Sequence, residues 1–169
     1  MRNPVQSRLR LIYAEIMWLA SREHVTPSVA RAWYTHVTAQ SLRKSIRRFT
    51  GFVSAQAASA IDSPLRLEHF KRIQTSLTAL VSKHKQKNLN RPKEFVDLVL
   101  DYEQVHIVTV SENYAAMKAK GNYADASIHL VHWNDIPSDR QAYLWKRMLR
   151  GRVSNAVDYA PSHDKQKKT

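Results

Sequence analysis

The sequence predicts a predominantly helical α+β protein, in which an N-terminal helical bundle packs against a small βαβα element. Glycine is scarce, because Gly51, Gly121 and Gly151 are the only three among 169 residues, and an all-β fold normally needs more glycine for its tight turns. Apolar residues recur with helical period along most of the chain, and only two short runs resemble strands. The apolar fraction of 43% is sufficient for a hydrophobic core.

The first two helices are expected near the N-terminus. A core-facing stripe runs from Gln6 to Arg22, formed by Leu9, Ile12, Tyr13, Ile16, Met17 and Ala20. Thr26 and Pro27 then supply an N-cap and a proline at the first helical position. We therefore expect a second helix there, with three residues facing inward, namely Val29, Trp33 and Val37.

The apolar residues after Thr38 point in another direction. At 100° per residue they centre on a face nearly opposite to that of the second helix, and they are Leu42, Ile46, Phe49 and Val53. One straight helix cannot bury both sets, so we predict a break at Thr38 to Ser41. A third helix, capped by Ser41, then continues to Ala60. A fourth helix is expected from Ser63-Pro64 and a fifth from Pro92, with a basic loop between them.

The character of the chain changes at Gln104. Residues 105–110 and 127–133 are predicted strands, and the sixteen residues between them suffice for a helical crossover. A parallel βαβ unit is therefore possible, followed by a last helix from Ser138 to Arg150. This reading divides one compact protein into a basic helical region (1–93), a small α/β region (94–157) and a mobile polar tail (158–169).

The formal net charge of +13 is unevenly distributed along the chain. Residues 1–93 contain 17 Lys and Arg against four acids, whereas residues 94–169 contain ten of each. Self-repulsion of this size opposes folding, and a polyanionic partner is the usual reason for a protein to carry it. We therefore predict a nucleic-acid-binding protein.

Two groups of cations are the predicted contacts to the nucleic-acid backbone. In the third helix, four cations lie opposite the apolar face, namely Arg43, Lys44, Arg47 and Arg48. The basic loop and the start of the fifth helix add Lys83, Lys85, Lys87, Arg91 and Lys93. The second and third helices could form a helix-turn-helix-like unit. The last helix also carries Arg140, Lys146, Arg147, Arg150 and Arg152 beside Tyr143 and Trp145, which either extend this surface or balance the acids of their own half.

An enzyme is the second hypothesis, specifically a metal-dependent nuclease or a nucleotide hydrolase. If the two strands are parallel, their carboxyl ends bring together polar residues at the edge where open α/β sheets bind ligands, namely Ser111, Glu112, Asn113 and Asp135. His106 begins an H…N…H order with Asn122, His129 and His132. However, His129 and His132 point to opposite faces of a strand, and no glycine-rich phosphate loop is present. We therefore predict no metal and no cofactor.

Composition narrows the remaining alternatives. The chain has no cysteine, which removes thiolate metal sites and disulfides and suits a reducing compartment such as the cytoplasm, although organelle import stays possible. No apolar stretch is long enough to span a membrane, and no membrane partner is expected. The predicted role is regulatory, accessory or ribonucleoprotein-structural, with DNA and RNA both open. A third hypothesis is an interaction factor that binds an acidic protein.

Overall fold

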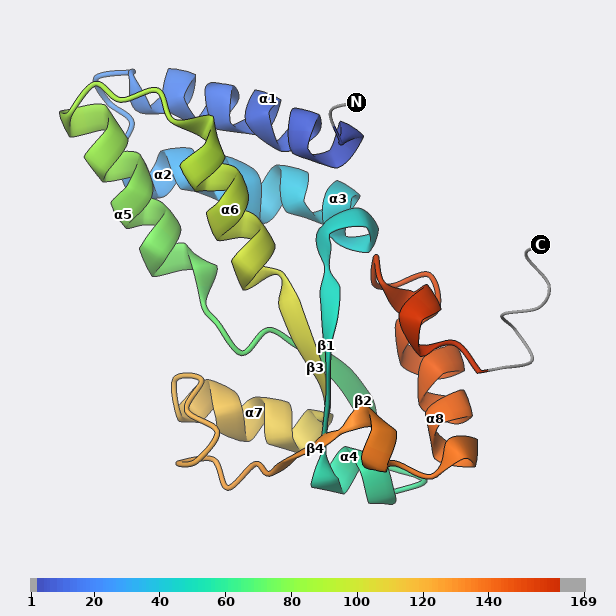
Figure 1. The fold of residues 1–169 in the computed structure, drawn as a ribbon. Helices are drawn as coiled ribbons and strands as arrows, with labels where there is room; N and C mark the ends of the chain where they lie inside the picture. Colours follow the sequence, from blue (N-terminus) through green and yellow to red (C-terminus); the bar gives the residue numbers. More distant parts are fainter. Residues whose placement is uncertain (1–2, 162–169) are drawn as a thin grey trace. The chain divides into compact units, whose positions relative to one another are not determined.

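The computed structural model describes residues 3–161, and the chain divides into two compact units (Figure 1). Unit 1 comprises residues 1–46 and 72–103, and unit 2 comprises residues 47–71 and 104–169. Residues 47–71 come from the middle of the predicted basic helical region, yet they belong to unit 2. Of the expected tail, residues 162–169 lie outside the described part, while Ala156–Tyr159 form the short helix η4.

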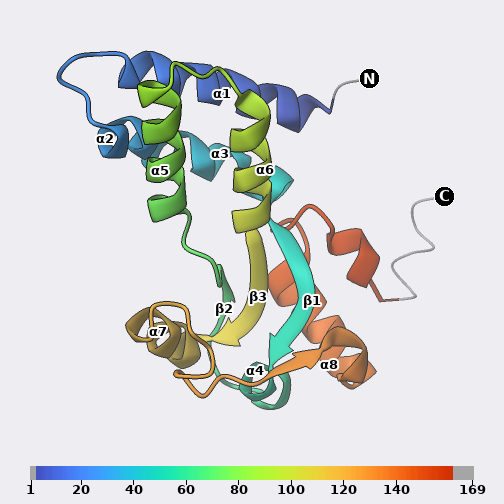
Figure 2. The same ribbon diagram turned by 60° about the vertical axis from the view of Figure 1, so that its left-hand side comes forward.

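Unit 1 is a bundle of helices. They are α1 (Pro4–Ala20), α2 (Pro27–Ala32), η1 (Trp33–Thr38), α3 (Ala39–Ile46), α5 (Ile73–Gln86) and α6 (Pro92–Tyr102). Proline begins α1, α2 and α6, and the Asn3 and Thr26 side chains accept hydrogen bonds from the first turns of α1 and α2. Figure 2 shows α5 and α6 side by side, with α1 lying across them. The predicted first and fifth helices are confirmed.

The predicted break at Thr38 to Ser41 is wrong, because α2, η1 and α3 follow one another without a turn. The segment η1 is a π-helix, whose wider turn rotates the helix face that follows it. The buried face consequently runs through Ala30, Tyr34, Ala39, Leu42 and Ile46. The residues predicted to face inward are instead exposed, namely Val29, Trp33 and Val37.

Unit 2 is built around a four-stranded mixed sheet. Its strands are β1 (Arg48–Ser54), β2 (Leu65–Glu68), β3 (Gln104–Thr109) and β4 (Leu130–His132), in the order β2-β3-β1-β4. Strands β1 and β3 are parallel, and the other two pairs are antiparallel. The fold class predicted from the sequence, a predominantly helical α+β protein, is confirmed.

Strand β1 replaces the middle of the predicted third helix, which is wrong there, whereas the alanine-rich end of that helix forms the separate helix α4 (Ala55–Ser59). A spacing of four residues keeps Phe49 and Val53 on one face of a helix, but it also keeps them on one face of a strand. This pattern therefore could not distinguish a helix from a strand. Gly51, with φ +88°, lies in an irregularity where the β1–β3 register shifts. The predicted start of the fourth helix at Ser63-Pro64 is also wrong, because β2 follows it and the helix begins at Ile73.

Helices cover both faces of the sheet. On one face, Phe49, Val53, Val105 and Ile107 form a core with residues of α8 (Ser138–Leu144) and η3 (Trp145–Leu149). On the other side, α7 (Val110–Lys118) contacts β2 and β3, as Figures 1 and 2 show. The short helix α4 (Ala55–Ser59) follows β1, and η2 (Trp133–Asp135) follows β4.

The predicted parallel pairing of 105–110 with 127–133 is wrong. Strand β1 lies between β3 and β4, and β4 is antiparallel to β1. The parallel partner of β3 is therefore a strand that the sequence pattern had assigned to a helix. Among residues 3–161, no helix is long and apolar enough to cross a membrane.

Candidate nucleic-acid interface

The four cations of the predicted third helix do not share one helix face. Arg43 and Lys44 are exposed on α3, which ends at Ile46. Arg47 follows the helix, and Arg48 is the exposed first residue of β1. The first two therefore belong to unit 1 and the last two to unit 2, and the predicted helix-turn-helix-like unit is absent from this part of the chain.

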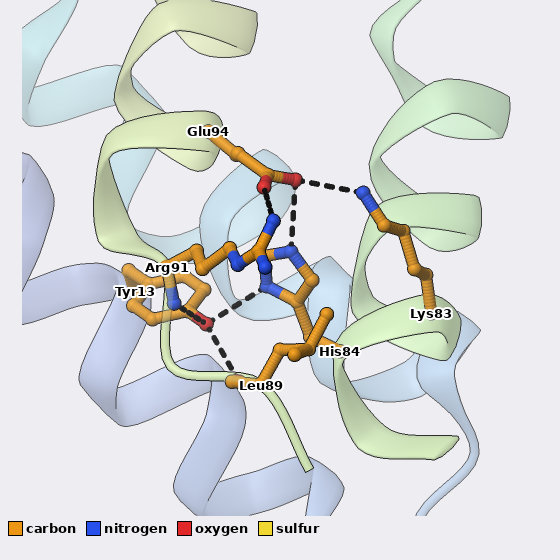
Figure 3. Close-up of polar contacts among 6 residues, drawn as sticks. All are labelled: Tyr13, Lys83, His84, Leu89, Arg91 and Glu94. Atoms are coloured by element: carbon orange, nitrogen blue, oxygen red, sulfur yellow. Dashed lines mark hydrogen bonds and ion pairs between the residues drawn. The ribbon is translucent and has the colours of Figure 1, made fainter. Parts of the chain in front are cut away.

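The predicted basic loop is wrong in its first part, because α5 continues to Gln86 and carries Lys83 and Lys85. The basic residues of this segment are organised around one carboxylate, that of Glu94 in the first turn of α6 (Figure 3). Glu94 Oε2 accepts a hydrogen bond from Lys83 Nζ at 2.9 Å and lies 3.1 Å from His84 Nε2. Its Oε1 accepts a bond from Arg91 Nη1 at 3.1 Å. These hydrogen bonds, first that of Lys83, lower the pKa of Glu94 to about 2.

A buried tyrosine completes this network. Tyr13 Oη lies 2.8 Å from His84 Nδ1, accepts a hydrogen bond from Arg91 N at 3.1 Å and reaches Leu89 O at 3.3 Å. His84 is fully buried, and Tyr13 is 2% exposed. Burial raises the pKa of Tyr13. The network joins α1, α5 and α6, so it holds unit 1 together and presents no open site.

Three of the five predicted backbone contacts in this region are consequently engaged with acids. Lys83 and Arg91 pair with Glu94, and Lys93 pairs with Asp97 at 2.5 Å. Lys85 Nζ donates to Val25 O at 3.3 Å, and Lys87 is exposed at the end of α5. The sequence segment 83–93 contains no acid, but folding brings Glu94 and Asp97 to its cations.

Counting charge by structural unit removes the asymmetry seen along the sequence. Unit 1 has thirteen Lys and Arg against six acids, for a net charge of +7, and unit 2 has fourteen against eight, for +6. The difference arises because residues 94–103 bring four acids to unit 1 and residues 47–71 bring four cations to unit 2. Both units are basic, so the arrangement of charges decides where an anion binds.

A group of four exposed cations lies in η3 of unit 2 and in the turn that follows it. Lys146, Arg147, Arg150 and Arg152 occupy four of seven consecutive positions, and all four side chains are exposed. We call residues 146–152 the basic segment. No acid occurs between Asp139 and Asp158. The sequence showed this run, but it did not distinguish a binding surface from charge that balances nearby acids.

The chain after the basic segment lies directly against the start of β1. Ser154 N and Oγ both donate to Arg47 O, at 2.8 and 3.0 Å. The Asn155 side chain accepts a bond from Phe49 N and donates to Phe49 O, each at 2.9 Å, as a neighbouring strand would. These bonds bring the basic segment and the exposed Arg48 to one region of unit 2. Residue spacing alone could not reveal this, since about a hundred positions separate the two segments.

The residues of the enzyme hypothesis do not come together as expected. Asp135 follows β4, which runs antiparallel to β1 and pairs Ser54 with Leu130 and Phe52 with His132. Asp135 is therefore directed toward the start of β1, away from Ser111, Glu112 and Asn113 at the carboxyl end of β3. The carboxyl edge instead joins β3 to the end of β1, where Ser54 Oγ donates to Glu112 Oε2 at 2.5 Å.

The polar residues at that edge serve the start of α7. Thr109 is the N-cap of α7, and it forms a capping box with Glu112. Glu112 Oε2 accepts bonds from Thr109 N and Oγ1 at 2.9 and 3.0 Å. Asn113 is buried and contacts Met117 Sδ at 3.7 Å. The hydrogen bonds of these residues therefore have a structural explanation.

His106 lies in an enclosed, mostly aromatic environment. Its ring stacks on Phe70 with a centroid distance of 4.5 Å, and its Nδ1 lies 2.6 Å from Thr50 Oγ1. Burial lowers the pKa of His106 to about 4, so the ring is neutral at physiological pH. Within residues 3–161, no group of three or more His, Asp or Glu side chains could hold a metal ion.

Comparisons with known proteins found no relative of this chain. No protein-family model matches the chain, and neither the curated proteins nor the solved structures gave a match. The function must therefore be inferred from the site itself.

Proposed function

We propose that the protein binds nucleic acid, mainly through backbone phosphates, and that the principal surface is the basic segment of unit 2 together with Arg48. The observation that carries this proposal is the group of four exposed cations within residues 146–152, in a stretch without acids from 140 to 157. The hydrogen bonds of Ser154 and Asn155 to β1 add Arg48 to the same region.

The cations of the basic segment repel one another, and a bound polyanion would relieve this repulsion. Like charges on adjacent turns repel one another, and phosphates spaced along a nucleic acid relieve that repulsion while releasing condensed counterions. Arginine provides three of the four cations, and its planar guanidinium binds a phosphate with two parallel hydrogen bonds. Cations also stabilise the carboxyl end of a helix, but that effect explains one or two such residues better than four.

The cations of unit 1 contribute less to this surface. Lys83, Arg91 and Lys93 would have to exchange a carboxylate for a phosphate, whereas Arg43, Lys44, Lys85 and Lys87 are distributed over two helices. We assign them to secondary contacts. A regulatory, accessory or ribonucleoprotein-structural role in the cytoplasm agrees with the absence of cysteine from the sequence.

The decisive experiment compares two variants with equal loss of charge. Replacing Lys146, Arg147, Arg150 and Arg152 by glutamine should lower affinity for a nucleic-acid oligomer and reduce the slope of log K against log salt by roughly three to four. Replacing Arg43, Lys44, Lys85 and Lys87 by glutamine removes the same charge and should change the slope by about one or less. Fluorescence anisotropy over a salt series measures both slopes.

Equal slopes for the two variants would mean that net charge, and not this surface, controls binding. A wild-type protein that binds neither DNA nor RNA at low salt would overturn the proposal as a whole. Circular dichroism of both variants checks that the replaced residues, all exposed or partly engaged at the surface, leave the fold intact.

A second candidate function is the binding of an acidic protein, because unit 1 exposes an apolar surface. Trp33 Nε1 donates to Glu15 Oε2 at 2.6 Å, which brings the exposed face of η1 beside the exposed face of α1. The exposed apolar side chains are Leu11 and Trp18 of α1, Trp33 and Val37 of η1, and Val29 of the preceding helix α2. Such a surface is typical of a site for an amphipathic helix, and the +7 charge of unit 1 favours an acidic one.

The probe for this candidate is an acidic amphipathic helical peptide with apolar residues at every third or fourth position. Binding should change the fluorescence of Trp18 and Trp33, and Trp18→Ala should weaken it. Binding that persists unchanged in Trp18→Ala would contradict this site. The enzyme hypothesis has no comparable support, since Glu112 and Asp135 follow strands that run in opposite directions.

A further inference from the structure

A surface groove adjoins the basic segment of unit 2. It has a volume of about 530 Å³ and lies between the chain that leads into β2 and the outer side of α8 and η3. The residues that matter for its chemistry are Asp62, Ser63, Tyr143, Arg147 and Arg152. A volume of this size is within the range of pockets that hold a small organic group, and two of its lining arginines belong to the basic segment.

Tyr143 presents an aromatic ring to this groove. The side chain is 45% exposed, so part of the ring is accessible to a ligand. The Arg140 guanidinium lies 4.8 Å from the ring centroid. Its Nη2 also donates to Ala57 O and Ala60 O, each at 2.7 Å, so the cation that contacts the ring is itself held in place. The ring is therefore a supported, accessible surface for stacking.

The charges around the ring define which ligand fits. Arg147 is one helical turn after Tyr143, at i+4, and therefore lies on the same side of the helix. Arg147 and Arg152 offer guanidinium groups to a phosphate. Asp62 repels a phosphate from its own part of the groove, but its carboxylate can accept a hydrogen bond from the exocyclic amino group of a base. The groove thus offers an aromatic surface, a cationic region and one acceptor.

We propose that this groove binds one unpaired nucleotide of a single-stranded nucleic acid, with the base on Tyr143 and the phosphate on Arg147 and Arg152. The inference rests on the proposed function, and it specifies the class of nucleic acid. In a duplex, every base is paired and stacked on its neighbours, and exposing one face to a protein ring requires the base to leave the stack. A single strand offers its bases without that cost, and stacking on an aromatic side chain depends little on sequence.

The experiment measures the affinity of the full-length protein for a single-stranded oligonucleotide and for the duplex of the same sequence. The single strand should bind about fivefold to a hundredfold more tightly, the range that one stacked base provides. Tyr143→Leu should remove this preference and leave duplex affinity within about twofold, because phosphate contacts are retained. Tyr143→Phe keeps the ring and should keep the preference.

Competition by a mononucleotide tests whether the ligand of the groove is a nucleic-acid polymer or a free small molecule. A nucleoside monophosphate should compete with the single strand only at concentrations far above the dissociation constant of the oligonucleotide, because it lacks the neighbouring phosphates. A mononucleotide that binds more tightly than the oligonucleotide overturns the assignment to a polymer.

The outcomes also separate the two proposals. Equal affinity for single strand and duplex, unchanged in Tyr143→Leu, overturns the groove assignment and leaves the proposed function standing. Loss of preference in both Tyr143→Leu and Tyr143→Phe shows that the hydroxyl, and not the ring, is responsible, and this also overturns stacking. Absence of binding to either form overturns the proposed function and this inference together.

Discussion

Units 1 and 2 have nearly the same net charge, but they arrange it in different ways. In unit 1, α6 supplies Glu94 and Asp97 to cations at the adjoining ends of α5 and α6, so three of the thirteen Lys and Arg, namely Lys83, Arg91 and Lys93, pair with a carboxylate. In unit 2, the basic segment carries four exposed cations and no acid. A basic composition alone therefore does not define an anion-binding surface, because the fold decides which cations already pair with carboxylates.

Each unit contains a buried histidine, and the two histidines have different surroundings. His84 in unit 1 contacts the hydroxyl of Tyr13 and the carboxylate of Glu94. In unit 2, His106 Nδ1 lies 2.6 Å from the neutral Thr50 hydroxyl, and the ring lies among the aromatic rings of Phe52, Phe70 and Tyr123. Burial favours the neutral ring, which explains the lowered pKa of His106. The units should therefore respond differently to acid.

The largest expected effect comes from matched substitutions in the two cores. Phe95→Ala in unit 1 and Phe49→Ala in unit 2 each remove a ring that is at most 1% exposed, and each should cost about 3–5 kcal/mol in the free energy of unfolding. The two hydrophobic clusters share no residue. Each substitution should therefore weaken amide hydrogen-exchange protection mainly in its own unit, on α1 for Phe95→Ala and on β3 for Phe49→Ala.

Loss of protection in both units from either substitution would show that the units unfold as one cooperative body. That result would contradict the view that the two units differ in stability, because a local difference in charge or pKa would then change the stability of both units together.

The next effect is acid destabilisation of unit 2. The pKa of His106 is about 4 in the folded protein and about 6.5 when unfolded. As pH falls from 6.5 to 4, the unfolded state therefore binds a proton that the folded state does not, and unit 2 should lose up to about 3 kcal/mol. Trp133 and Trp145, both buried in unit 2, report this unfolding by fluorescence.

His106→Gln provides the control, since glutamine can still bond to Thr50 but does not titrate in this range. Its stability should be flatter than that of the wild type between pH 6.5 and 4. The same pH dependence in both proteins would assign the acid sensitivity to other groups.

The smallest effect concerns unit 1 at lower pH. The pKa of Glu94 is lowered to about 2 from its usual 4.5, so its stabilisation is complete above about pH 4.5 and is lost as pH falls toward 2. Glu94→Gln should remove this pH dependence and lower the melting temperature of unit 1 slightly, because the carboxylate is accessible to solvent. Thermal unfolding at pH 6 and pH 3 measures the difference between the two proteins.

If Glu94→Gln leaves the melting temperature unchanged at both pH values, the ion pairs of Glu94 do not contribute to the stability of unit 1. The cations of segment 83–93 would then be as available to an anion as those of the basic segment.

Some elements of the fold could be predicted because their signals are local. An apolar stripe identified α1, and proline at the first helical position identified α6, and both begin within a few residues of the expected starts. The β-branched run at 105–110 likewise forms β3. Strand β1 could not be predicted in this way, because the four-residue spacing of Phe49 and Val53 is compatible with a helix and with a strand.

The candidate site shows the same division. The sequence by itself determined the fold class, the excess of cations, the absence of cysteine and the existence of the run at 146–152. Only the tertiary structure decided which cations meet a carboxylate, since Glu94 collects Lys83, His84 and Arg91 from two sides of a turn. The physical reason is that periodicity reports one element at a time, whereas charge compensation depends on contacts between elements. For the same reason, the pairing of β1 with β3, and the bonds that join residues 154–155 to β1, could be read only from the folded chain.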